Sequence, residues 1–253
     1  MTNRVWDWLK NQLTQQEPSA KATPCFWQTD IHSHLIPGID DGVKTVEQSL
    51  TCIRQLAEWG IQKVITTPHI SQDHYPNEAA AILQGRDALQ QQVDMEQIPV
   101  RIEVAAEYML DNLFLERLAS APLLSFGPKR YLLIETGWLA RPLLLDEMIF
   151  RIQTSGYTPV LAHPERYAYY LNDLASLERL RDQGCLMQLN WMSITGRYGP
   201  HVRNQAKLIL KNKWVNFIGS DLHRPEDLPA LQAFFSTSAY EQLKEQPLLN
   251  TTL

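Results

Sequence analysis

The sequence is poor in cysteine, in basic charge and in long hydrophobic runs, and each shortage excludes a class of protein. Three cysteines in 253 residues, odd in number and far apart, cannot build a disulfide framework and are typical of reduced thiols in a cytoplasmic protein. A net charge of -5 gives no overall attraction for nucleic acid or an anionic membrane. The most apolar region, residues 131–150, is broken by four charged side chains, and the N-terminus lacks the apolar core of a secretory signal. We therefore expect a cytoplasmic protein with no nucleic-acid partner and no membrane span.

A change in composition near residue 24 divides the chain into a short arm and one domain. In residues 1–24, Trp6, Leu9 and Leu13 could form one face of a helix, and the polar stretch 15–24 indicates a linker. We expect this helix to pack on the domain or on a neighbouring subunit, the second of which would make a homo-oligomer. Residues 25–253 are sufficient for one globular domain with a large core.

From Phe26 onward, apolar strand patterns alternate with amphipathic helix patterns. Helices are expected at 46–60, 78–93, 143–156, 174–184 and 200–212, and several close with Gly or Asn, as helix ends tend to. Strands are expected at 26–32, 63–69, 101–107, 131–135, 158–163, 186–190 and 215–221. Such alternation predicts a parallel sheet with the helices outside. Seven units favour a closed, TIM-like (β/α)7 barrel over an open sheet.

Side chains that can bind metals stand at or next to the ends of six of the seven expected strands. Because the carboxyl ends of barrel strands open onto one face, these side chains would converge there. Two pairs, 32 with 34 and 221 with 223, are spaced two residues apart, so both members of each pair point the same way on an extended chain. The complete set in chain order is His32, His34, His69, Glu107, Glu135, His163, Asp221 and His223.

Each of these residues taken alone has an ordinary structural explanation. A single histidine at a strand end is more often a hydrogen-bonding residue than a ligand, and Asp221 could cap the following helix. Yet five of the seven histidines lie at successive strand ends together with acids, a pattern that separate structural roles explain poorly. Imidazole and carboxylate without thiolate suit Mn, Fe or Zn. Two or more such ions can clamp a phosphate and generate hydroxide from bound water.

The loop after the first expected strand and several arginines border the same face. Asp40 and Asp41 stand in a segment with two glycines that allows a tight fold over the strand ends, although an Asp-Asp-Gly sequence is usually only a turn. Guanidinium is the natural bidentate partner of phosphate oxygens. Arg166 and Arg224 each lie within three residues of an expected ligand and are the preferred candidates, whereas Arg197 is interpreted as a surface charge.

The motifs HSH, DDG, TPH, AAEY, LIET, AHPERY and SDLH, in this order, resemble those of the PHP (polymerase and histidinol phosphatase) superfamily. The phrases DIHSHLIPGIDDGVKT and LAHPERY resemble the bacterial CpsB/YwqE-type protein-tyrosine phosphatases, regulators of capsule and exopolysaccharide synthesis. The resemblance runs from Thr29 to His223. It implies a PHP-type (β/α)7 barrel with three divalent metal ions, often Mn, at the carboxyl ends of the strands. It also implies a phosphoric monoester hydrolase that uses a metal-bound hydroxide on a phosphotyrosine protein, such as the tail of a bacterial tyrosine kinase.

The resemblance further implies a role for each matching residue. The first ion would be held by His32, His34, Glu107 and Asp221. The second would be held by Glu107, Glu135 and His163, with Glu107 as the bridge. The third would be held by Asp41, His69 and His223. Arg166 and Arg224 match arginines that this branch uses near the phosphate, and related histidinol phosphatases tend to have histidine where Asp41 stands.

Three other functions were weighed against this one. A cysteine-dependent phosphatase needs an arginine six residues after its cysteine, and the residues found at that spacing are Ile31, Glu58 and Trp191. A small-molecule phosphatase such as histidinol phosphatase is the nearest alternative enzyme. A metal-stabilised module that binds phosphotyrosine without hydrolysing it is the alternative outside enzymes, and it would hold its ions with no open coordination position.

Overall fold

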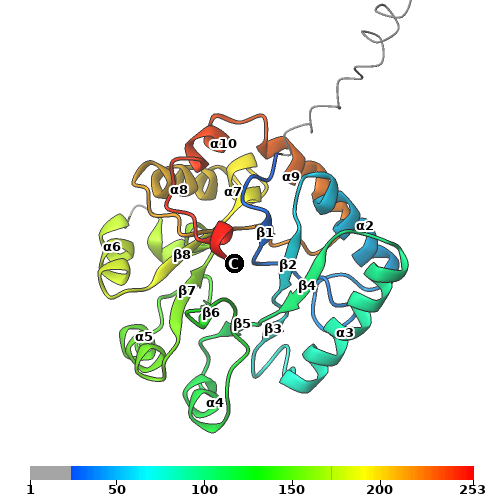
Figure 1. Ribbon diagram of the computed structural model, residues 1–253. Helices are drawn as coiled ribbons and strands as arrows, with labels where there is room; N and C mark the ends of the chain where they lie inside the picture. Colours follow the sequence, from blue (N-terminus) through cyan, green and yellow to red (C-terminus); the bar gives the residue numbers. More distant parts are fainter. Residues whose placement is uncertain (1–23, 172) are drawn as a thin grey trace, which may run out of the picture.

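The structure, a computed structural model, describes residues 24–171 and 173–253 and has a mixed α/β fold. Figure 1 shows the strands gathered at the centre and the helices arranged around them. The expected arm with Trp6, Leu9 and Leu13 lies outside the described residues. The described chain begins at Pro24, whose carbonyl oxygen accepts a hydrogen bond from the Tyr240 hydroxyl at 2.7 Å.

The strands form two sheets in which every neighbouring pair is parallel. The smaller sheet has the order β1 (Thr29–Asp30), β2 (Lys63–Thr66), β4 (Arg101–Val104). The larger sheet has the order β3 (His69–Ile70), β5 (Glu107–Met109), β6 (Tyr131–Glu135), β7 (Thr158–Ala162), β8 (Leu186–Asn190), β9 (Phe217–Gly219).

Five of the seven expected strands differ from their predicted extent: β7 ends one residue early, β9 keeps only Phe217–Gly219 of 215–221, and the other three change more. Strand 63–69 is broken into β2 and β3 around Pro68, which has no amide hydrogen to donate to a neighbour, and strand 101–107 is broken into β4 and β5 at Ala105 and Ala106. These two chain segments therefore run from the smaller sheet into the larger one. The first strand, expected at 26–32, is paired only at Thr29–Asp30, because Gln28 before it has a left-handed φ of 57°.

Within the described residues the five helices expected after Phe26 are present, and four short α-helices accompany them. The predicted helices are α2 (Val46–Glu58), α3 (Ala79–Met95), α5 (Leu145–Thr154), α6 (Leu174–Asp182) and α8 (Pro200–Lys211). The helices that were not predicted have five to seven residues and are α4 (Phe114–Ser120), α7 (Trp191–Thr195), α9 (Leu228–Phe234) and α10 (Ser238–Leu243). Such short segments contain fewer than two turns and show little periodicity.

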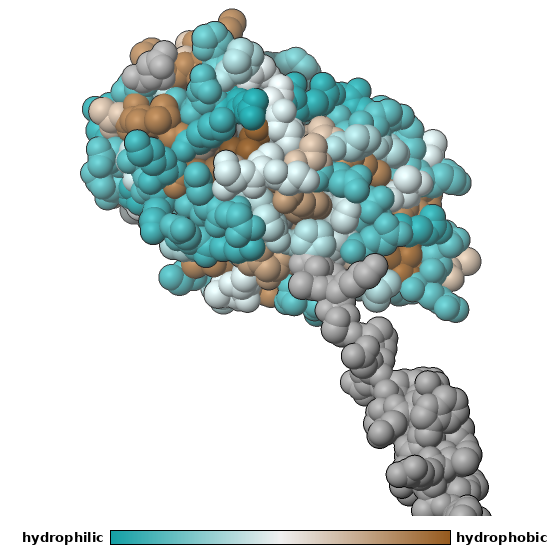
Figure 2. Space-filling model, turned by 90° about the horizontal axis from the view of Figure 1, so that it is seen from above, coloured by the Kyte–Doolittle hydropathy of each residue, from teal (hydrophilic) through white to brown (hydrophobic). Residues whose placement is uncertain are grey.

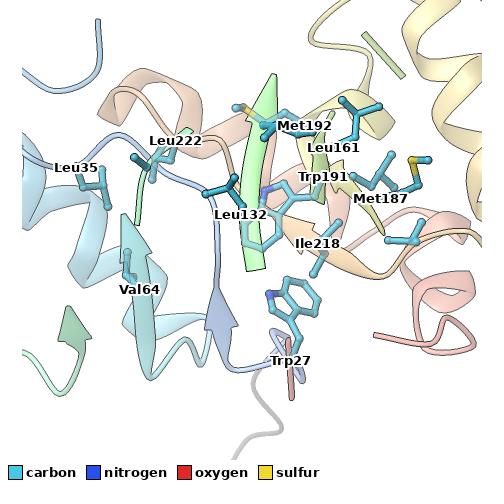
Figure 3. Close-up of a cluster of buried hydrophobic side chains, with 14 of the residues drawn as sticks. Trp27, Leu35, Val64, Leu132, Leu161, Met187, Trp191, Met192, Ile218 and Leu222 are labelled. Carbon is cyan, nitrogen blue, oxygen red and sulfur yellow. The ribbon is translucent and has the colours of Figure 1, made fainter. Parts of the chain in front are cut away.

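Alternating strand residues fill two separate hydrophobic clusters. Leu133 and Val160 belong to a smaller cluster together with Ile31 and Phe217, whereas their sequence neighbours Leu132 and Leu161 belong to the larger one. Successive side chains of a strand point to opposite faces, so β2, β6, β7 and β9 each supply both clusters. Figure 3 shows part of the larger cluster, in which Trp27 and Trp191 lie near Ile218, and their ring centroids are 5.1 Å apart.

Side chains join β1 to β9 where the backbone of these two strands does not pair. The Asn250 side chain donates to Thr29 O at 2.9 Å and to Ile218 O at 2.8 Å, and its oxygen accepts from Ile218 N at 3.0 Å. The buried Asp30 carboxylate accepts from the backbone N and the hydroxyl of Ser220 at 2.9 and 2.6 Å. Further along, Asp221 N donates to His32 O at 2.7 Å and His34 N to Leu222 O at 3.0 Å. Segments 29–34 and 218–222 are thus held together side by side.

The face seen in Figure 2 is largely hydrophilic, with small hydrophobic areas between polar residues. Among the described residues, no helix combines the length and apolar character that crossing a bilayer requires.

Replacing Asn250 should destabilise the fold strongly. Asn250→Ala removes three hydrogen bonds and leaves the partner groups on Thr29 and Ile218 buried and unpaired, which should cost about 2–4 kcal/mol of unfolding free energy. Thr251→Ala, at the exposed neighbouring position, is the control. Urea unfolding followed by circular dichroism measures both variants, and equal midpoints would contradict this role of Asn250.

Candidate metal centre

Eight of the nine residues predicted as metal ligands lie at or just beyond the carboxyl ends of the expected strands, His69 and Glu107 being the first residues of β3 and β5, and the ninth, Asp41, lies in a loop. Their donor atoms form four overlapping groups, and within each group the atoms are within 4.8 Å of one another. The groups are His34, Asp41, His69 and His223; His32, His34 and Asp221; His32, Glu107 and His163; and His69, Glu107 and Glu135. Residues from the ends of six expected strands and from one loop thus meet in one place, as the parallel fold predicts.

The Glu107 carboxylate lies at the centre of these groups and is fully buried. Its Oε2 is 3.2 Å from His32 Nε2, 3.2 Å from His69 Nδ1 and 3.5 Å from His34 Nε2. Its Oε1 is 3.0 Å from His163 Nε2. Burial by itself would raise the pKa of Glu107, but attraction to His32 and His69 holds this pKa well below its ordinary value. Glu107 is therefore a buried anion that four imidazoles face.

Hydrogen bonds on the far side fix the His32 and His34 rings. His32 Nδ1 lies 2.9 Å from Gln188 Oε1, and this oxygen also accepts from the backbone N of His163, so it must be an acceptor. His34 Nδ1 lies 2.8 Å from the Asp40 carboxylate. Both Nδ1 atoms therefore carry the hydrogen, and both Nε2 atoms direct lone pairs toward the centre.

The two Nε2 atoms are only 3.3 Å apart and also face carboxylate oxygens of Glu107 and Asp221. Lone pairs and anions at this spacing repel one another unless positive charge lies between them. Without a cation, that charge must come from protons: although burial lowers it, the pKa of His32 is raised to about 9 by Glu107 and Asp221. This donor set fits divalent cations, which would neutralise the same charges without protonating the rings.

Two further buried atoms agree with this conclusion. Glu107 Oε1 and His69 Nδ1 are shielded from solvent and have no aligned hydrogen bond, although His163 Nε2 lies 3.0 Å from the first and Glu135 Oε1 lies 2.8 Å from the second. A cation could satisfy each of them. The backbones of His163 and Asp221 are left-handed, with φ of 36° and 52°, a strained conformation that clusters at functional sites in proteins.

The outer part of the centre is more open to solvent. The half-exposed Asp41 carboxylate lies 3.4 Å from His69 Nε2 and 3.5 Å from His223 Nε2. Glu135 lies 2.8 Å from His69 Nδ1 on the opposite side of that ring. Burial, and then repulsion by Glu107, raises the pKa of Glu135. An incoming anion would meet this outer edge first.

The two candidate arginines occupy different positions at the edge. Arg166 donates to Asp221 Oδ2 at 2.8 Å, and its guanidinium lies between the rings of Trp138, at 4.4 Å, and Tyr198, at 4.2 Å. Arg224 is 59% exposed and donates to Asp227 Oδ2 at 3.3 Å. Arg224 lines a cavity of about 560 Å³ together with Asp41, so both arginines border the centre, but only Arg166 is rigidly held.

Sequence reasoning missed the residues that orient the ligands. Gln188 holds His32 and His163, and Asn190 donates to Asp221 Oδ2 at 2.6 Å. These two polar side chains are fully buried and two positions apart on β8, so they point to the same side of the sheet. The sequence signal that could have identified them is the alternation of amide side chains with Met187 and Leu189 in this short strand. Nothing in the sequence distinguished Asp40, which orients His34, from an ordinary turn residue.

Loss of Glu107 should remove more metal than loss of Asp41. Glu107→Ala deletes the carboxylate that faces four histidines, whereas Asp41→Ala deletes a half-exposed group that faces two. Elemental analysis of both variants after dialysis against manganese, with the thermal midpoint measured on the same samples, gives the comparison. Equal, full metal content in both variants would show that Glu107 is not central to binding.

Comparison with known proteins agrees with this geometry. The family model for capsular polysaccharide synthesis, CpsB/CapC, matches residues 28–239. The tyrosine-protein phosphatase YwqE of Bacillus subtilis is 30% identical over 77% of this chain and 76% of its own length. The tyrosine-protein phosphatase CpsB of Streptococcus pneumoniae is 28% identical over 79% of this chain and 84% of its own length.

A solved structure leads to the same family. It comes from crystal structures of YwqE and CpsB, described as unique metal-dependent tyrosine phosphatases. It matches with a TM-score of 0.74 at 28% identity and covers 86% of this chain and 91% of that chain. The chain therefore belongs to the CpsB/CapC family of capsular polysaccharide synthesis.

Proposed function

We propose that this chain is a metal-dependent protein-tyrosine phosphatase, a phosphoric monoester hydrolase that acts without a cysteine nucleophile. The observation that carries the proposal is the convergence of nine histidine, aspartate and glutamate side chains around the buried Glu107 carboxylate. The relatives named above, which are tyrosine phosphatases, support the same substrate class.

The three cysteines support a mechanism without a thiol. Cys25, Cys52 and Cys185 are buried and none belongs to the groups at the strand ends. Burial raises the pKa of Cys52 and of Cys185 to about 12, so neither is a thiolate near neutral pH. A covalent phosphocysteine therefore has no suitable nucleophile.

We propose that the centre holds three divalent ions, manganese in the first instance, with iron or zinc as alternatives. The first would lie among His32, His34, Glu107 and Asp221. The second would lie among Glu107, Glu135 and His163. The third would lie among Asp41, His69 and His223. Support comes from the clustering of donor atoms: the group formed by His34, Asp41, His69 and His223 contains all three residues proposed for the third ion.

The bound ions would supply Lewis acidity toward phosphate oxygens and lower the pKa of a coordinated water. The side chains of the chain do the remaining work. Glu107 and Asp221 keep the centre anionic enough to retain cations, and Gln188 and Asp40 prevent the His32 and His34 rings from turning. Arg166, held between two rings, offers its remaining N–H groups to phosphate oxygens as charge develops on them. Tyrosine is a better leaving group than serine, so no strong general acid is needed.

We also propose that the two sheets form one closed (β/α)7 barrel of the PHP type, built by residues 25–253. The continuations of β2 into β3 and of β4 into β5 reduce the strands to seven units. The hydrogen bonds between segments 29–34 and 218–222 bring the first unit beside the last. In this arrangement residues 1–24 supply no ligand, since every proposed ligand follows Asp30.

For the biological substrate, we propose a phosphotyrosine protein of capsule or exopolysaccharide synthesis in the cytoplasm, such as the tail of a tyrosine kinase. The family description and the names of the relatives support this choice.

The proposed activity predicts turnover that depends on metal and not on thiols. The manganese-loaded protein should hydrolyse a phosphotyrosine peptide much faster than histidinol phosphate or single-stranded DNA, and chelation should abolish the reaction. A variant combining Cys25→Ala, Cys52→Ala and Cys185→Ala should retain most of the rate per folded molecule, because none of these thiols reaches the site. Activity that survives exhaustive chelation but disappears in the folded triple variant would refute the mechanism.

Arg166→Ala should lower kcat/KM for a phosphotyrosine peptide by about 2–4 kcal/mol of transition-state stabilisation, the scale of one preorganised donor. Lysine should restore only part of this loss, because a point charge cannot replace the fork clamped between Trp138 and Tyr198. Arg101→Ala, an exposed arginine at the amino end of β4, is the control and should stay near the wild-type rate. Metal content is measured on the same samples, because Arg166 also contacts Asp221. A change in kcat/KM below about twofold would exclude phosphate binding by Arg166.

A further inference from the structure

Exposed large hydrophobic side chains are concentrated beside the metal centre. Seven are exposed among the described residues, and five of these lie between positions 138 and 150. They are Trp138, Leu139, Leu143, Leu144 and Phe150, of which Leu139 and Leu143 are 86% and 97% exposed. We call residues 137–144, which connect β6 to α5, the apolar loop. Single exposed hydrophobic residues are ordinary, but such a concentration marks a binding surface.

The base of the apolar loop is built into the centre. The loop starts two residues after Glu135, a proposed ligand at the end of β6. The Trp138 ring stacks on His163 at a centroid distance of 5.3 Å and lies against the Arg166 guanidinium. The backbone oxygen of Trp138 accepts a hydrogen bond from Ala168 N at 3.0 Å. One end of the loop is thus fixed at the proposed phosphate site, whereas its leucines project into solvent.

We infer that the apolar loop is a docking surface for a polypeptide segment that carries a large apolar side chain close in sequence to its phosphotyrosine. The inference rests on the proposed function, because a phosphate at Arg166 brings the neighbouring residues of its chain to Trp138 and beyond. Burying an exposed leucine side chain stabilises a complex, so Leu139 and Leu143 can select substrates through contacts away from the phosphate.

The size and charge of the apolar loop favour a peptide segment over other occupants. It has eight residues, 137–144, whereas a stable interface between folded proteins takes about 20–30 residues from each partner. Anionic membrane surfaces require basic side chains next to the apolar ones. The one basic residue of the loop, Arg141, is held by Asp146 at 2.6 Å, and Glu147 adds a further negative charge nearby.

Two phosphotyrosine peptides that differ only in a leucine or a serine beside the phosphotyrosine test this inference, together with free phosphotyrosine. The wild-type protein should have a higher kcat/KM for the leucine peptide. The double variant Leu139→Ser, Leu143→Ser should lose about tenfold on that peptide. It should change less than twofold on the serine peptide and on free phosphotyrosine, which do not use these leucines. Met95→Ser, at a position on α3 that is 74% exposed, is the matched control and should behave as wild type.

Equal kcat/KM of the wild-type protein for the two peptides would overturn the inference, and so would an equal loss on free phosphotyrosine in the double variant. Light scattering gives the oligomeric state of each variant. A change in that state without any peptide effect would assign the loop to contact between two copies of the chain.

Non-hydrolysable phosphonate versions of both peptides separate this inference from the proposed function. If no phosphotyrosine substrate is turned over, the proposed function fails, and a preference for the leucine phosphonate in fluorescence anisotropy would still support the docking surface. The absence of that preference would overturn the docking surface itself.

Discussion

A buried carboxylate surrounded by imidazoles determines how the carboxyl ends of the strands are arranged. Glu107 is cut off from water, and a lone negative charge in that position would be very unfavourable. Four histidines from three chain segments therefore face it. Gln188 and Asp40 orient the rings of His32 and His34. Because positive charge must remain inside this group, cation binding and the stability of the surrounding loops depend on the same electrostatic balance.

The junction between the first and last strands explains how the side chains of His32 and Asp221 come to point at the same place. At that junction the carboxylate of Asp30 and the amide of Asn250 take over hydrogen bonds that two paired strands would otherwise make. Segments 31–34 and 220–223 then pair through a single bridge between Ser33 and Leu222, and Asp221 adopts a left-handed backbone beside it. Regular pairing would direct side chains at i and i+2 along parallel lines. Departure from it lets Asp221 and His32 converge from adjacent segments.

Much of this site could be predicted from the sequence, because its donors follow apolar strands and parallel strands end on one side of a sheet. For His69 or Glu135, the position at the end of an apolar strand pattern is enough to make the prediction. The position in a strand does not identify residues whose role depends on a partner far away in the sequence. Gln188 acts through His32, 156 positions away, and Trp138 and Tyr198 clamp Arg166 from separate loops. The short helices and the breaks in two strands were missed because tertiary packing, rather than periodicity, defines them. The role of Arg224 remains a prediction, since its guanidinium is bonded to Asp227 and open to solvent.

The burial of all three thiols also lowers their sensitivity to oxidants. Peroxide attacks thiolates, and phosphatases that depend on a low-pKa cysteine lose activity when that sulfur is oxidised. Here the sulfur atoms are shielded and protonated, and the donor atoms at the strand ends are imidazole nitrogens and carboxylate oxygens. Oxidative conditions that silence a thiolate enzyme would leave these donors chemically unchanged. Thiol oxidation, the switch that controls cysteine-dependent phosphatases, therefore has no counterpart among the donor atoms of this site.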